Sequence, residues 1–69
     1  MNKTVKSWLE GFINREIDDI LGRIKNSEIR CSKISDKEIL RMQLDSLSLY
    51  NEYLTALKTL KNRIEREDL

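Results

Sequence analysis

Apolar residues recur at intervals of one, three and four residues along two long segments of this chain. That spacing is the period of an α-helix and not the alternation of a β-strand. The first segment shows it from Val5 to Ile24, and we place a helix over about residues 3–30, with Asn2 or Thr4 as its N-terminal cap. The second segment predicts a helix over about residues 36–66, because it contains neither proline nor glycine. Its densely charged last turns, Lys58 to Asp68, are expected to fray.

A helix-start signal lies between the two segments. Ser35-Asp36-Lys37-Glu38 has the form of a capping box. In such a box the Ser35 hydroxyl accepts from the Glu38 backbone N–H, and the Glu38 carboxylate accepts from the backbone N–H of Ser35. Ile34 and Ile39 flank the cap as a hydrophobic staple. Two helices joined by so short a linker are expected to fold back as an antiparallel αα-hairpin, which makes residues 1–69 a single all-α domain.

One apolar stripe on each predicted helix is expected to form the core of the hairpin. With the turn near Lys33, Ile17 and Ile20 would lie near Leu47 and Tyr50. Cys31 falls on the continuation of the first stripe, and we interpret it as a small buried hydrophobe, with a reactive thiol or an intermolecular disulfide as the alternatives. The predicted core consists of Phe12, Ile13, Ile17, Ile20, Ile24, Leu40, Leu44, Leu47, Leu54 and Leu57.

A second apolar stripe lies on an adjoining face of the second helix. A helix with one neighbour needs an apolar arc of about 100°, whereas here the arc covers well over half of the circumference. We therefore predict that two hairpins pair into a dimeric four-helix bundle. The alternative is a monomer in which Tyr50 and Tyr53 are edge residues. The predicted interface consists of Met42, Leu49, Tyr53, Ala56, Leu60 and Trp8, of which Trp8 is either part of the core or an anchor for a partner.

Size and composition also favour a partner chain. A domain of 69 residues buries only about 60% of the surface of its unfolded chain, so that disulfides, a metal or a partner usually add stability. Cys31 is the single cysteine and histidine is absent, so neither a disulfide within the chain nor a metal or other cofactor is expected. Without histidine the usual general base near neutral pH is missing, and we expect a protein that is not an enzyme.

Charge and hydropathy narrow the classes of partner. The formal net charge of +1 argues against nucleic acid and acidic membranes as partners. No run approaches the ~18 apolar residues of a membrane span, and the N-terminal segment lacks a signal-peptide core. One unpaired cysteine fits a reducing compartment, so a cytoplasmic location is expected.

Two further features of the first helix have a structural interpretation. Asp19 and Arg23 are four residues apart in the orientation that favours an ion pair on a helix. Gly11 and Gly22 are eleven residues apart and therefore share one helix face. That face either permits close approach of another helix or lies by chance on the solvent side, and the sequence leaves both open.

Two resemblances suggest alternative functions. The second helix has Gln43-Leu44-Asp45 and Asn51-Glu52-Tyr53. These segments resemble the signature of helical hairpins that dephosphorylate response regulators in spore-forming bacteria, Ser-Gln-Glu-Leu-Asp before Asn-Glu-Tyr. The Ser-Gln-Glu run is missing, and the distance from Asp45 to Tyr53 is two residues too long. The resemblance implies an aspartyl-phosphate phosphatase that needs Asp45.

In length and shape the chain is also similar to the plasmid-encoded RNA-binding hairpins that dimerise into a four-helix bundle. That similarity implies a bundle-type RNA-binding regulator, although the basic residues are scattered over both helices here. The residues themselves favour a non-catalytic interaction module, an adaptor, inhibitor or regulator. We expect it to self-associate and to bind a further, unidentified protein. Small chains of this type, poor in helix breakers, are common among the regulatory and mobile-element proteins of bacteria.

Overall fold

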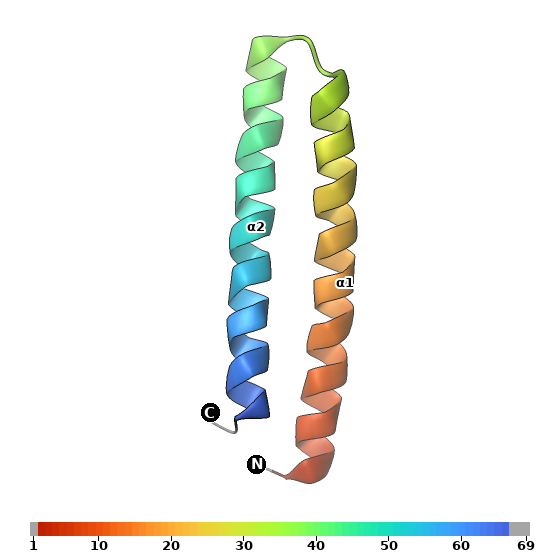
Figure 1. Ribbon diagram of the computed structural model, residues 1–69, viewed down its shortest axis with the longest axis vertical. Helices are drawn as coiled ribbons and strands as arrows, with labels where there is room; N and C mark the ends of the chain where they lie inside the picture. Colours follow the sequence, from red (N-terminus) through yellow and green to blue (C-terminus); the bar gives the residue numbers. More distant parts are fainter. Residues whose placement is uncertain (1, 67–69) are drawn as a thin grey trace.

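The computed structural model describes residues 2–66, which form two α-helices, α1 (Lys3–Lys33) and α2 (Lys37–Glu65). The helices run antiparallel and are joined at one end by residues 34–36 (Figure 1). At the open end of the hairpin, Lys6 Nζ donates to the carbonyl oxygen of Glu65 at 3.4 Å. The molecule measures 51 × 16 × 11 Å, so it is one helix thick. The predicted all-α hairpin is confirmed, and α1 continues three residues beyond its predicted end at residue 30.

Side-chain caps begin both helices. The Asn2 side chain accepts from the backbone N–H groups of Thr4 at 2.7 Å and Val5 at 3.4 Å, which decides between the two predicted caps of α1. At α2 the cap is Asp36, whose Oδ1 accepts from the backbone N–H groups of Glu38 at 2.9 Å and Ile39 at 3.0 Å.

The predicted capping box of Ser35 and Glu38 is therefore wrong by one residue. Because α1 extends to Lys33, Ser35 is an exposed residue of the linker. A carboxylate caps a helix as well as a hydroxyl does, and it also places negative charge at the positive end of the helix dipole. Ile39 is exposed, so the predicted staple does not form a buried contact.

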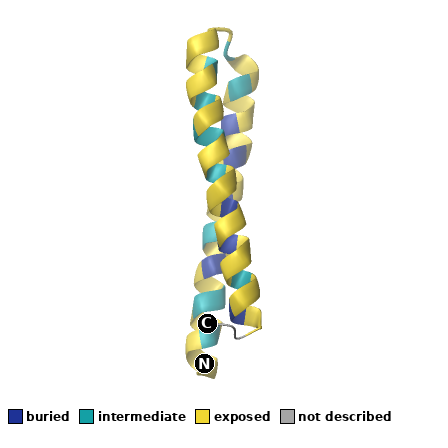
Figure 2. Ribbon diagram, turned by 90° about the vertical axis from the view of Figure 1, so that its left-hand side faces the viewer, coloured by how far each residue is buried: buried dark blue, intermediate teal, exposed yellow. Residues whose placement is uncertain are grey.

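The core is a single seam between the helices, seen as the line of buried segments in Figure 2. Ile20, Ile24, Leu54 and Leu57 form one buried cluster, and Ile17, Leu47 and Tyr50 pack against it. Ile17 and Ile20 thus share a cluster with Leu47 and Tyr50, as predicted. Ile13 is also buried. Ser27 is a buried residue that the sequence did not indicate, and its Oγ has no hydrogen-bond partner among the described residues.

Two predicted core residues are exposed instead: Phe12 at 43% and Leu44 at 48%. On α2 the seam follows positions 47, 50, 54, 57, 61 and 64, and its continuation toward the linker reaches the half-buried Gln43 rather than Leu44. On α1 the buried position belongs to Ile13, one residue beyond Phe12. A shift of one residue turns a side chain by about 100° around a helix, so these neighbours cannot both face the seam.

The end of α2 also differs from the prediction. Ile64 is only 1% exposed although it lies in the charged turns that were expected to fray. Its position follows Leu57 at the heptad interval of seven, so it continues the seam to the end of the helix. Asp68, the last residue of the predicted frayed segment, lies outside the described residues.

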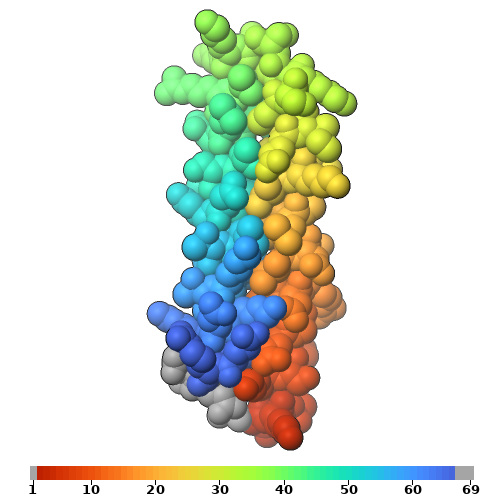
Figure 3. Space-filling model, in the orientation of Figure 1, coloured from red at the N-terminus to blue at the C-terminus, as the bar shows by residue number. Residues whose placement is uncertain are grey.

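Much apolar surface remains uncovered by this packing. The helices contact each other along their length (Figure 3). The residues that this contact buries form one line between them (Figure 2). Between residues 2 and 66, neither helix is both long enough and apolar enough to cross a membrane. The large hydrophobic side chains that stay exposed are Val5, Trp8, Phe12, Leu21, Ile29, Ile39, Met42, Leu44, Leu49, Tyr53 and Leu60.

Candidate interaction surface

The predicted interface residues of α2 are exposed in the hairpin. Met42 is 66% exposed, Leu49 64% and Tyr53 47%, and Ala56 and Leu60 are exposed as well. With Ser46 they follow the intervals four, three, four, three, four, which is the heptad spacing of a second seam beside the one that packs on α1. We call these six positions the outer stripe: Met42, Ser46, Leu49, Tyr53, Ala56 and Leu60.

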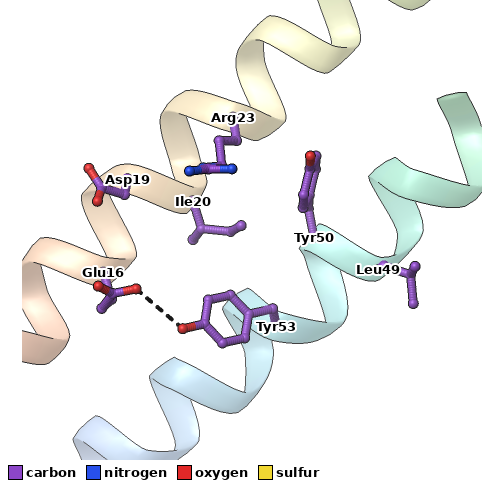
Figure 4. A pocket seen from close by; sticks show the side chains of 7 residues that line it. All are labelled: Glu16, Asp19, Ile20, Arg23, Leu49, Tyr50 and Tyr53. Carbon is purple, nitrogen blue, oxygen red and sulfur yellow. Dashed lines mark hydrogen bonds between the residues drawn. The ribbon is translucent and has the colours of Figure 1, made fainter.

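A groove opens halfway along the hairpin on the side of the outer stripe. Glu16, Asp19, Ile20 and Arg23 of α1 line it opposite Leu49, Tyr50 and Tyr53 of α2 (Figure 4). Tyr53 Oη donates to Glu16 Oε2 across the groove at 3.3 Å. The groove therefore combines apolar walls with two carboxylates and one guanidinium.

The Tyr53 phenol is perturbed by this environment. Partial desolvation, then the nearby negative charge of Glu16, and then the hydrogen bond to its carboxylate raise the pKa of Tyr53 above its usual value of 10.0. All three favour the neutral phenol over the phenolate. Tyr53 is thus a neutral hydrogen-bond donor throughout the physiological pH range.

Among residues 2–66 no ion pair neutralises the charges of the groove. The predicted ion pair of Asp19 with Arg23 is not formed, and within residues 2–66 no ion pair involves Glu16 either. In Figure 4 the Arg23 guanidinium and the Asp19 carboxylate point in different directions. Both signs of charge are therefore available to a group that enters from outside.

Trp8 belongs to the same side of the hairpin. It is 63% exposed, which excludes the predicted alternative of a core residue, and its ring stacks on Phe12 with centroids 5.9 Å apart and planes 14° apart. Trp8, Phe12, Glu16, Asp19 and Arg23 follow one another at intervals of four, four, three and four, so they form one stripe along α1. The contact of Glu16 with Tyr53 joins this stripe to the outer stripe. We call the two stripes together the groove face.

The remaining candidate residues lie elsewhere. Cys31 is half-buried with a free thiol. Gly11 and Gly22 are exposed, and a Cβ at either would meet nothing within 4 Å, so neither marks a close approach of helices in the hairpin. Asp45 is an exposed residue of α2 and is not among the residues that line the groove.

Comparison with known proteins adds no relative. The chain matches no protein-family model, no curated protein and no solved structure. The chemistry of the groove face is therefore the basis for a functional proposal.

Proposed function

We propose that this chain is a non-catalytic protein–protein interaction module that self-associates through the outer stripe of α2 into a four-helix bundle. In that form it would act as an adaptor, inhibitor or regulator of another protein. One observation carries the proposal: α2 has two neighbouring heptad seams, and α1 covers only one of them. The single cysteine supports a reducing compartment such as the cytoplasm.

The energetics of the exposed side chains favour a covered stripe. Completing the burial of Met42, Leu49 or Leu60 would contribute about 1 kcal/mol for each side chain, because fully burying an aliphatic side chain contributes about 1.5–3 kcal/mol. Two copies double the gain. An apolar stripe that runs along about five helical turns is also the kind of contiguous patch that monomers rarely leave in water.

The alternative functions have less support. A phosphatase would use Asp45, which lies outside the groove. An RNA-binding bundle would need a basic face, whereas the groove face carries two carboxylates beside Arg23.

Leu49→Glu tests the proposal. A carboxylate at this position would have to be buried without a partner in the bundle, so we expect the dissociation constant of the dimer to rise about a hundredfold, ~3 kcal/mol. Size exclusion with light scattering gives the mass, and circular dichroism on the same samples gives the helicity. Leu49→Glu should shift from two chains toward one and keep part of its helicity.

Two substitutions of the same kind serve as controls. Leu44→Glu changes another exposed leucine, about 140° around the helix from Leu49 at 100° per residue, and should leave the mass unchanged. Leu57→Glu places the charge in the seam with α1 and should unfold the chain. A wild-type protein that is monomeric and stable at high concentration would overturn the proposal, and the outer stripe would then be a docking surface for a different protein.

A further inference from the structure

The positions of the outer stripe are spaced symmetrically about position 51 of α2. Met42 and Leu60 are each nine residues from position 51, Ser46 and Ala56 are each five, and Leu49 and Tyr53 are each two. A second copy laid antiparallel about this point would set Met42 against Leu60 and Leu49 against Tyr53. A parallel copy would set each residue level with its own counterpart, so the spacing alone does not distinguish the two orientations.

The charges on α1 distinguish the antiparallel orientation from the parallel one. On the α1 stripe of the groove face, the point halfway between the negative Glu16 and the positive Arg23 lies between Asp19 and Ile20. Ile20 and Tyr50 line the same groove, and Glu16 contacts Tyr53, so this midpoint lies at the same height along the hairpin as position 51 of α2. The centre of the charge pattern and the centre of the apolar pattern thus coincide.

We propose that the second copy packs antiparallel on the groove face, with Arg23 of each chain entering the groove of the other beside Glu16 and Asp19. The inference rests on the proposed self-association and adds its orientation and the residue that fixes it. Each groove would gain ion-pair partners for Glu16 and Asp19, which form no ion pair among residues 2–66 of their own chain. Two symmetric sites of this kind form per dimer, as an interface with a two-fold axis requires.

A parallel pairing would leave the carboxylates without a cation. A two-fold axis along the hairpin lays α1 of one copy over α2 of the other, so Glu16 and Asp19 would face the apolar outer stripe. Carboxylates removed from water without a cation are costly. The antiparallel pairing lays α1 on α1 and sets Glu16 of one copy against Arg23 of the other.

The ends of the groove face agree with the antiparallel orientation. Reversal about the α1 midpoint brings the exposed Trp8 of one copy close to the height of Arg30 of the other. Arg30 follows Arg23 by seven residues and therefore lies on the same stripe of α1. A guanidinium over the face of an indole ring is a favourable cation–π contact.

A charge exchange tests the orientation in the full chain. Arg23→Glu would place a third carboxylate at each site and should weaken the dimer at least about tenfold in sedimentation equilibrium. Combining it with Glu16→Arg restores opposite charges across an antiparallel interface, so the double variant should recover most of the affinity. Across a parallel interface the two α1 stripes do not face each other, so the double variant should not recover the affinity. Arg41→Glu, the same change at an exposed position outside the stripe, should have no effect.

A distance measurement gives an independent answer. In a Cys31→Ser background, Ser35→Cys puts a spin label in the exposed linker of each chain. Antiparallel packing separates the two labels by on the order of 45 Å, at 1.5 Å of rise per helical residue. Labels close together, or a double variant as weak as Arg23→Glu in a wild-type protein that is dimeric, would overturn the inference and leave the proposed function standing. A monomeric wild type would overturn both.

Discussion

At the scale of single residues, the Tyr53–Glu16 hydrogen bond links the two helices and makes the hairpin sensitive to alkaline pH. The raised pKa of Tyr53 means that the folded chain holds this phenolic proton at a pH where the unfolded chain has lost it. The resulting stabilisation is complete below pH 10.0, the ordinary pKa, and is lost as the pH rises through the higher folded value. Ultraviolet titration of the phenols should show Tyr53 ionising above 10.0.

The matched control for that titration is Glu16→Gln, which removes the charge and weakens the hydrogen-bond acceptor. It should move the Tyr53 ionisation back toward 10.0, and Tyr53→Phe identifies which of the two transitions belongs to Tyr53. If Glu16→Gln leaves the titration curve unchanged, the groove geometry described for Tyr53 is incorrect.

The cap of α2 provides a second prediction for single residues. Asp36→Ala should lower the free energy of unfolding by about 1 kcal/mol, because the backbone N–H groups of Glu38 and Ile39 lose their acceptor. Ser35→Ala should change it by no more than about 0.5 kcal/mol, the usual range for an exposed residue. Urea unfolding at one fixed protein concentration compares the two variants. A larger loss for Ser35→Ala would show that the capping box predicted from sequence forms after all.

At the scale of elements, the two glycines weaken α1 without serving the hairpin. Glycine inside a helix is less stable than alanine by about 1 kcal/mol, and a Cβ at Gly11 or Gly22 would meet nothing within 4 Å. Gly11→Ala and Gly22→Ala should therefore each raise the free energy of unfolding by about 0.5–1 kcal/mol in thermal unfolding. A loss of stability or of dimer mass in either variant would mean that another helix approaches this side of α1 closely.

The two helices also differ in how they use their apolar residues. On α1 the buried seam is flanked by the Trp8–Phe12 stack near the open end and by charged groups halfway along. On α2 the buried seam is flanked by the outer stripe from Met42 to Leu60. A helix with two apolar seams on adjoining faces can satisfy both only with a neighbour on each. This is why α2 would be the central helix of a bundle.

At the scale of the whole molecule, thinness limits what one chain can bury. A hairpin 11 Å across in its shortest direction has a single layer of helices, so each helix has one neighbour and can bury only one seam. Buried apolar residues are consequently few among residues 2–66: Ile13, Ile20, Ile24, Leu54, Leu57 and Ile64. Small domains of this kind commonly depend on a second chain for stability. Self-association would supply it by adding a second layer.

The sequence by itself determined the helices and their connection. Periodicity over about thirty residues, the absence of proline and a short linker act locally, and they suffice to predict an antiparallel hairpin with a second apolar stripe on α2. The cluster that Ile17 and Ile20 share with Leu47 and Tyr50 also follows from local rules and the position of the turn.

Only the tertiary structure decided which neighbouring residue faces the seam. Ile13 faces the seam instead of Phe12, and position 43 faces it instead of Leu44. Likewise, Asp36 caps α2 instead of Ser35. The tertiary structure also kept α2 ordered as far as Ile64. Residues next to each other differ by about 100° around a helix, and apolar arcs on α2 adjoin, so the sequence allows several rotations of each helix. The contact with the other helix selects one rotation, because only one buries a continuous heptad seam on both sides at once.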